Sequence, residues 1–314
     1  MKEKSQFEKN AADKQVELLS EALNGAVSAG GHWLNATGKG YPKFYPKGVA
    51  VSPFNSLFMA LHSDKTGSKT NLFTLYSEAK ARGESVREHE KGVPFLFYNW
   101  NKYVNRNNPN DIISRNDYQQ LPPEERNRYK GIHNREIRTL FTIDQTLLPL
   151  VDKNVYETLV QKHGNSVEQG FGEKELRELR PRFNAFVQAI SKNMVPVRTD
   201  GSGVAHYDSQ KDAVYIPRQK DFEHYTDYAQ ETLRQIIAAT GHQQRLAREG
   251  MVMKNGVPPT EDAVKQEHLI SEIASGIKML EMGLPARLSD GSVKLVDYWL
   301  SLIHISEPTR RTPI

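Results

Sequence analysis

Apolar residues recur every three or four positions in several stretches of the chain, which is the spacing of one face of an α-helix. In the first stretch Val16, Leu19, Leu23 and Val27 follow this spacing, and the glycines at 30 and 31 end it. The pattern predicts helices over residues 11–29, 55–62, 74–82, 176–192, 222–239 and 262–282.

Short runs rich in β-branched and aromatic residues predict strands between these helices. Residues 85–86 and 93–100 are expected to form a hairpin around the turn Glu90-Lys91-Gly92, and 137–143 a further strand. Residues 32–53 are rich in Gly, Pro and Lys and are expected to be loop. A polar insertion follows at 105–134, and a small sheet is predicted from short strands at 195–197, 205–207 and 213–216.

Composition places the chain among globular proteins with room for two domains, each with a core of its own. Of its 314 residues 38% are hydrophobic and 25% charged, and the mean hydropathy is −0.64. No apolar stretch is long enough for a membrane span, and the first residues have no apolar signal-peptide core. The absence of cysteine excludes disulfides, thiolate ligands and a cysteine nucleophile. A net charge of +4 is compatible with nucleic-acid binding but is not evidence for it by itself.

The most informative stretch is RQIIAATGHQQRL, residues 234–246, which has the frame of a zinc-protease helix without its zinc chemistry. Such a helix needs His-Glu-x-x-His, with two imidazole ligands one turn apart and a carboxylate base beside the first. Here the ligand positions hold Arg234 and Ala238, and the base position holds Gln235. A protonated guanidinium and a methyl group offer no lone pair, and an amide is not a base. In this frame, Arg234-Gln235-Ile236-Ile237-Ala238 neither binds zinc nor hydrolyses a peptide, so we expect no catalytic residue, no metal and no cofactor.

The motifs around this helix resemble the C-terminal zincin-like domain of the ArdC family of antirestriction proteins. They are, in order, Tyr207, Asp212 and Pro217, then Thr240-Gly241-His242 and Arg245-Leu246, then the segment 267–272. The resemblance implies that the position of the third metal ligand falls on His268. Glu267 lies one residue before that position, and Glu272 matches the second carboxylate of the family's motif. We expect Arg234 to fill the vacated cavity and to pair with Glu272 or Glu267, because an unpaired buried guanidinium is very costly.

Residues 11–150 resemble the N-terminal domain of the same family, which binds single-stranded DNA. The matching pieces include Trp33 and the segments 46–61, 73–79, 83–87 and 140–146. Single-strand binding needs cations for the phosphates and exposed aromatic rings on which bases stack. Phe44 and Trp100 are as compatible with packing in the core as with stacking on a base. Any single Lys or Arg is also compatible with an ordinary solvated surface position. The candidate single-strand contacts are Lys43, Phe44, Tyr45, Lys47, Arg82, Arg87, Lys91, Trp100 and Tyr103.

These observations predict an α+β fold of two domains. A mixed α/β single-stranded-DNA-binding domain spans residues 1–150, with its insertion at 105–134, and a connector spans 151–175. A zincin-like domain of a small sheet and helices spans 176–299. Residues 300–314, LSLIHISEPTRRTPI, resemble a translated sequencing adapter, so the natural protein is expected to continue differently beyond Trp299.

The leading hypothesis is a cytoplasmic, antirestriction-like protein of a conjugative or mobile element. Its partner would be single-stranded DNA, not a membrane, and its catalytically dead second domain would contact a protein. One alternative is an active zinc metalloprotease with a rearranged site of His242, His268 and Glu272, since one helical turn places the last two on one face. Another is an interaction protein whose two domains have no affinity for DNA.

Overall fold

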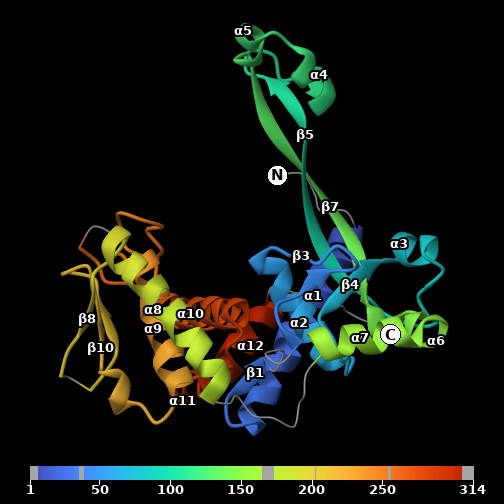
Figure 1. The fold of residues 1–314 in the computed structure, drawn as a ribbon. Coiled ribbons are helices and arrows are strands. Elements are labelled where there is room, and N and C mark those ends of the chain that lie inside the picture. Colours follow the sequence, from blue (N-terminus) through green and yellow to red (C-terminus); the bar gives the residue numbers. More distant parts are fainter. Residues whose placement is uncertain (1–5, 35–38, 165–172, 202, 254–255, 306–314) are drawn as a thin grey trace, which may run out of the picture.

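The first half of the chain is a curled sheet with two helices packed against it (Figure 1). The computed structural model describes residues 6–34, 39–164, 173–201, 203–253 and 256–305. Helices α1 (Gln6–Ser28) and α2 (Pro53–Lys65) pack on a six-stranded sheet of order β3-β2-β4-β7-β5-β6. Its strands are β2 (Lys43–Phe44), β3 (Val49–Ala50), β4 (Leu72–Leu75), β5 (Val93–Asn105), β6 (Ile112–Ser114) and β7 (Tyr129–Thr142). The other helices of this half are α3 (Tyr76–Ala81), α4 (Arg115–Gln120), α5 (Pro123–Arg126), a 3-10 turn (Ile143–Gln145), α6 (Leu148–Val151) and α7 (Lys153–His163).

Helix α2 also closes one free edge of the sheet. The side-chain amide of Asn55 donates to the Leu96 carbonyl and accepts from the Leu96 N–H, each at 2.9 Å. Strand β6 pairs only with residues 102–104 of β5, so these two bonds satisfy backbone groups that would otherwise lie unpaired at a buried edge. This explains how Asn55, a polar residue, can be buried in helix α2.

Strands β5 and β7 continue beyond the body of the sheet as a projecting arm, defined here as residues 99–134 (Figure 1). They pair antiparallel, and β5 carries one extra residue between Asn99 and Lys102, which is a β-bulge. Strand β6 and helices α4 and α5 form the tip. There Ser114 and Asp117 form a capping box at the start of α4, and the ring of Tyr118 stacks on Tyr103 at 3.8 Å between centroids. The predicted insertion is therefore an ordered ribbon with a packed tip.

The second half is a small three-stranded sheet with long helices beside it. The sheet has the order β8-β10-β9, in which β10 is parallel to β8 and antiparallel to β9. Helices α9 and α10 contact each other, and α9 also contacts β10. The elements are α8 (Glu173–Asn193), β8 (Val197–Thr199), β9 (His206–Asp208), β10 (Ala213–Ile216), a 3-10 turn (Gln219–Asp221), α9 (Tyr225–Thr240), α10 (Glu261–Met282), β11 (Ala286–Arg287), α11 (Asp290–Val293) and α12 (Val296–Ile305).

The two halves share one large core, which differs from the expectation of a separate core for each domain. Strand β1 (His32–Leu34) pairs with β11 from the far end of the chain. The indole of Trp33 packs against Gly276 of α10 so closely that a Cβ at that glycine would overlap the ring. Apolar residues of both halves form a single buried cluster. Two smaller clusters lie under the β8–β10 sheet and beside α7.

Several predicted elements differ from the structure because their partners are distant in the sequence. The predicted hairpin of 85–86 with 93–100 is wrong, since Val86 forms only an isolated bridge with Thr146 and β5 pairs with β7. The predicted loop over 32–53 contains three short strands, and the connector contains helix α7. Of the suspected adapter segment, residues 300–305 continue α12 and Leu300 is buried in the shared core. Residues 165–172 and 306–314 lie outside the described ranges. Within those ranges, no helix is both long and apolar enough to cross a bilayer.

Candidate functional site

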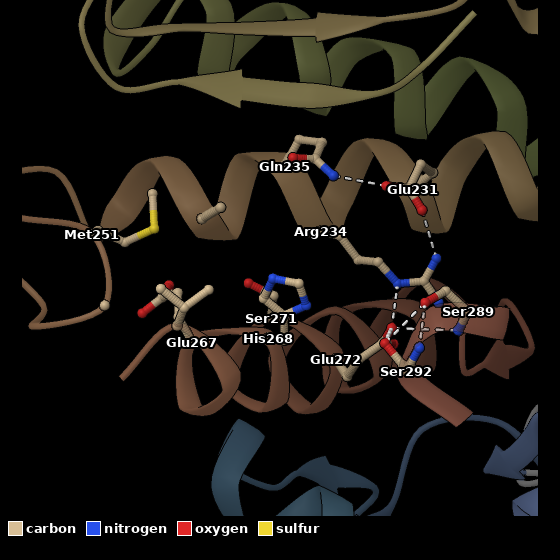
Figure 2. Close-up of a pocket in the computed structure, with 13 residues that line it drawn as sticks. Glu231, Arg234, Gln235, Met251, Glu267, His268, Ser271, Glu272, Ser289 and Ser292 are labelled. Carbon is tan, nitrogen blue, oxygen red and sulfur yellow. Dashed lines mark hydrogen bonds and ion pairs between the residues drawn. The ribbon is translucent and has the colours of Figure 1, made fainter. Parts of the chain in front are cut away.

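A pocket of about 220 Å³ lies between helices α9 and α10 (Figure 2). The three positions that the sequence frame assigns to vacated ligands, Arg234, Ala238 and His268, all line it. Positions one helical turn apart share a face, so α9 and α10 each present a row of side chains to the same space. The other lining residues are Glu231, Gln235, Gly250, Met251, Val264, Glu267, Ser271, Glu272, Ser289 and Ser292.

The guanidinium of Arg234 bridges the two walls of this pocket. Its Nη1 donates to Glu231 at 2.8 Å, one turn earlier on α9, and its Nε lies 2.9 Å from Glu272 Oε1 on α10. Its Nη2 donates to the carbonyl of Arg287 in β11. Burial acts to lower the pKa of Arg234, but the Glu272 and Glu231 carboxylates outweigh it and the pKa is raised. Arg234 therefore remains a cation, and its predicted pairing with Glu272 is confirmed.

Glu272 is one of the most buried charged groups of the described chain, at 2% exposed. Its Oε1 accepts from the Ser292 hydroxyl and from the Ser289 N–H, in addition to its ion pair with Arg234. Its Oε2 has no hydrogen-bond partner among the described residues. Ser289 caps α11 by accepting from the Ser292 N–H, so the short helix holds these donors against the carboxylate. A buried carboxylate is tolerated here because a cation and two donors share one of its oxygens.

A second arginine neutralises the other buried carboxylate of the pocket. The Nε of Arg248 donates to Glu267 Oε2 at 2.8 Å and its Nη2 donates to Oε1, which makes a bidentate pair. Its Nη2 donates to the Ile237 carbonyl at 2.8 Å and its Nη1 to the Thr240 hydroxyl at 2.7 Å. Arg248 thus satisfies a carbonyl near the end of α9 while tying that helix to α10. The alternative pairing of Arg234 with Glu267 does not occur.

The motif residues before and after α9 form a separate ion-pair network that anchors the small sheet. Arg245 pairs with both oxygens of Asp212 and donates to the Ala239 carbonyl at 2.7 Å. Tyr207 also donates to Asp212, at 2.7 Å. The hydrogen bonds from Arg245 are the main cause that lowers the pKa of Asp212 to about 2. Asp208 accepts from the N–H groups that follow it in its turn, so both aspartates have structural roles.

His242 does not join the pocket. It is 8% exposed and its Nδ1 accepts from the Gln244 N–H at 3.3 Å, whereas His268 and Glu272 line the pocket without it. Among the described residues, no three His, Cys, Asp or Glu side chains are grouped as metal ligands would be. The trio of the rearranged metalloprotease site is therefore not brought together.

The predicted DNA-contacting cations fall into two groups. Arg82 is paired with Glu84 at 2.9 Å and Arg87 with Glu90 at 2.6 Å, so acidic neighbours already neutralise their charges. The others, Lys43, Lys47 and Lys91, have no ion pair within the described ranges, and the last two are exposed. Lys47 and Lys91 are thus the predicted cations most available to a phosphate.

The predicted aromatic contacts are split between the two faces of the sheet. Phe44 packs edge-on against Phe95, with centroids 5.2 Å apart, on the core face. Side chains alternate along a strand, so Tyr45 lies on the opposite face, where the Arg82 guanidinium covers its ring at 4.8 Å. One face of Tyr103 is covered by Tyr118, and the side chain of Trp100 lies outside the described residues. The expected alternation of cations and rings within one loop does not produce one binding surface.

Two family models match the two halves of the chain. The N-terminal domain of anti-restriction factor ArdC matches residues 9–141, and the zincin-like metallopeptidase model matches residues 181–308. The metal-free crystal structure of the antirestriction ArdC protein from the R388 plasmid is similar over 92% of this chain and 89% of that chain, with a TM-score of 0.56 and 20% identity. The chain is an ArdC-like protein. The Mn(II)-bound structure of the same plasmid protein has a TM-score of 0.55 at 18% identity, covering 91% and 88%. No curated protein matches the chain significantly.

A zincin-like metallopeptidase model implies a metal ion, and the pocket of this ArdC-like protein does not fit one. The guanidinium of Arg234 lies between the carboxylates of Glu231 and Glu272, where it supplies the positive charge that a metal would supply. Ala238 offers no donor atom, and Gln235 uses its amide nitrogen to donate to Glu231 at 2.7 Å. A divalent cation here would be opposed by a permanent positive charge.

Sequence reasoning missed several residues that shape the two sites of the ArdC-like protein. Glu231 is one turn before Arg234, so helical spacing alone is a usable signal for their pairing. No sequence spacing predicts the pairing of Arg248 with Glu267, because Arg248 lies in the loop after α9 and Glu267 lies in α10. Arg138 lies over the ring of Phe97 at 4.9 Å, and the strand register that joins them is visible only in the folded sheet.

Proposed function

We propose that this protein is a cytoplasmic single-stranded-DNA-binding, antirestriction-type protein of a conjugative element, whose second domain is not a peptidase. The match of residues 9–141 to the N-terminal domain of anti-restriction factor ArdC carries the DNA-binding half of this proposal. The cationic side chain of Arg234 inside the zincin-like pocket carries the other half.

The first half offers groups of the kind that single-strand binding requires. Exposed Lys47 and Lys91 are available to phosphates. Phe97 is half-buried at the place where the sheet leaves the core, and the Arg138 guanidinium, which pairs with Glu136 at 2.8 Å, lies over its ring. Rings of this kind stack on bases. Phosphate capture and stacking together would hold a strand without reading its sequence, with affinity that falls as salt rises.

Electrophoretic titration with single-stranded and double-stranded oligonucleotides of one sequence, at two salt concentrations, tests the DNA-binding half. We expect tighter binding of the single strand. Replacing Lys47 and Lys91 by alanine should weaken single-strand binding about fivefold and lower the salt slope by about 1.4, which corresponds to two lost phosphate contacts. The matched control replaces Lys192 and Lys220, exposed lysines of the second half, and should leave binding unchanged. Absence of single-strand binding by the full chain refutes this half.

The non-peptidase half rests on the charge balance of the pocket. Arg234 pairs with Glu231 and Glu272, and Arg248 pairs with Glu267, so each of these three carboxylates already has an arginine as its partner. We propose that the domain acts as a structural and protein-contacting module with this pocket closed by arginine.

Elemental analysis after dialysis against zinc or manganese tests this second half. We expect no retained metal, and no peptide hydrolysis that a chelator abolishes. An Arg234→His, Ala238→His double variant serves as the comparison, because it returns two imidazoles to positions i and i+4. A stoichiometric, chelator-sensitive ion in the unmodified protein would favour the rearranged metalloprotease instead.

A further inference from the structure

The arm carries a row of cations on one face that the fold itself does not explain. After the bulge, residue pairs across the ribbon follow Lys102↔Ile132 and Val104↔Lys130. The ladder continues one step further, since the Arg106 N–H donates to the Arg128 carbonyl at 2.7 Å. Directly opposite residues share a face, and so do residues two apart on one strand. Lys102, Arg106, Arg128 and Lys130 therefore lie on the same face, called the cationic face below.

These four cations are exposed and have no acidic partner within the described ranges. Two of the four carboxylates of the arm, Asp111 and Asp117, are used elsewhere, and Glu124 and Glu125 lie in helix α5 at the tip. Asp111 accepts from the Tyr129 hydroxyl at 2.8 Å and from Asn105 at 2.9 Å on the other face of the ribbon, and Asp117 caps α4. Arg106 and Arg128 are directly opposite each other, and like charges in that relation destabilise a strand pair. A repulsion of this kind on a projecting ribbon points to an anionic ligand that relieves it.

The aromatic rings of the arm lie on the opposite face. Tyr103 is stacked on Tyr118, and the ring of Tyr103 also neighbours Gly131 across the ribbon. Tyr129 is held by its bond to Asp111. Among its described residues, the cationic face therefore offers charges and aliphatic side chains without a stacking platform. Single-strand binding depends on such platforms, whereas a duplex is bound through phosphates alone.

The shape of the arm agrees with a duplex as its ligand. Figure 1 shows the ribbon extending away from both halves of the molecule, with its tip clear of the body. Beyond the bulge, residues 102–104 of β5 pair with β7 on one side and with β6 on the other, so the arm is three strands wide at the cations. A cationic face of this width can contact the phosphates along the outside of a duplex. The exposed amides of Asn101, Asn107, Asn108 and Asn110 lie close to Lys102 and Arg106 in the sequence, and amides of this type bond to phosphates and base edges.

We propose that the arm is a binding element for double-stranded DNA, which it contacts through the phosphates with Lys102, Arg106, Arg128 and Lys130. This inference goes beyond the single-strand binding proposed for the body of the first half. Together they describe a protein that holds a single strand on its body and the adjoining duplex with its arm. The DNA that such a protein fits is a junction between a single strand and a duplex.

Fluorescence anisotropy with a labelled single strand, a blunt duplex and a tailed duplex tests the proposal on the full chain. The arm variant replaces Lys102, Arg106, Arg128 and Lys130 by alanine. We expect its affinity for the duplex to fall about tenfold or more, with a salt slope lower by about 3 to 4. Its affinity for the single strand should stay within twofold of the unmodified protein.

Two controls keep this result specific. Replacing Arg182, Lys192, Lys220 and Lys294 by alanine removes the same charge from exposed positions of the second half and should not change duplex binding. Replacing Lys102 and Lys130 by arginine keeps the charge and should retain it. No loss of duplex affinity, an equal loss for single strand and duplex, or a lack of duplex binding by the unmodified protein overturns the proposal. If the unmodified protein binds the duplex but not the single strand, the proposed function fails and the assignment of the arm stands.

Discussion

The guanidinium of Arg234 lies 2.9 Å from the carboxylate of Glu272, and the two side chains join helices α9 and α10 across the pocket. Glu272 is buried and Arg234 is nearly so, with side chains 2% and 13% exposed. A buried pair of this kind holds its helices in one register because either charge alone would be strongly unfavourable there. The positive charge in the pocket is therefore the guanidinium of Arg234.

Removing Arg234 should destabilise the protein by about 3 kcal/mol or more, since Glu272 would remain as an uncompensated buried charge. We expect Arg234→Ala and Glu272→Ala each to be costly and the double variant to cost less than their sum, with a coupling of about 1–3 kcal/mol. Urea unfolding of the four proteins measures this. The control is Arg218→Ala, whose partner Asp221 forms an exposed pair and whose loss should leave the free energy of unfolding nearly unchanged. Strict additivity would argue against the pairing.

Gly276→Ala should destabilise the contact between the two halves. The new Cβ would overlap the indole of Trp33, and overpacking of a close-packed core costs about 1–3 kcal/mol. The matched control is Gly25→Ala in α1, where an added Cβ meets no atom within 4 Å and where alanine favours the helix. Thermal unfolding of the two variants should therefore shift in opposite directions. A Gly276→Ala protein as stable as the parent would contradict the close approach.

Asp212→Asn should lower stability at neutral pH by about 1–2 kcal/mol, a figure reduced for solvent screening. Bonds from Arg245 hold the folded-state pKa of Asp212 at about 2, below its usual 3.8. A depressed acid pKa contributes stability that is fully present above the unfolded-state pKa and is lost as pH falls through the folded-state pKa. The difference between parent and variant should therefore be constant from pH 7 to about 4 and shrink below that range. Urea unfolding at several pH values measures it, and a difference that varies between pH 7 and 5 would point to another group.

His62 should make the protein less stable as the solution becomes mildly acidic. Burial is the main cause that lowers the pKa of His62, and its Nε2 lies 3.1 Å from the Gln145 side-chain oxygen. That oxygen also accepts from the Thr142 N–H, so Nε2 carries the proton of the neutral ring. Below the usual pKa of 6.5 the unfolded chain takes up a proton that the folded chain resists, so stability falls with pH.

The comparison that isolates this effect is a His62→Gln variant. Its stability at pH 7 should be lower than that of the parent, and the gap should narrow as pH falls from 7 towards 5 because the variant lacks the titrating ring. Chemical unfolding across this range measures the gap. A gap that widens would mean that the folded state stabilises the charged imidazole.

The helices and the pocket positions were accessible from the pattern of residues alone. Helices α8, α9 and α10 follow three-and-four spacing and lie within a few residues of their predicted ranges. The slots at Arg234 and Ala238 were placed by the spacing of the zinc-ligand motif and the slot at His268 by the family resemblance, and all three line one pocket. Spacing suffices there because residues one turn apart on a helix always share a face.

The strand pairing of the sheet and its arm could not be predicted from the sequence pattern. Strand β5 pairs with β7 some forty positions away rather than with the nearby residues 85–86, and no local pattern encodes a partner at that separation. The bulge between Asn99 and Lys102 shifts the facing of every later side chain in β5. Phe44 and Tyr45, adjacent in the chain, pack against different clusters because successive side chains of an extended segment point to opposite faces.

Local chemistry in the chain was therefore enough to establish the helical framework and the absence of metal-ligating side chains at positions 234 and 238, because both depend on residue types at short spacings. Folding decided which charges meet. Arg234 could have paired with either downstream carboxylate, and it pairs with Glu272 because Arg248 reaches Glu267 from the following loop. Folding likewise gathers four cations of the arm onto one face, since strand register and one bulge set the direction of each side chain.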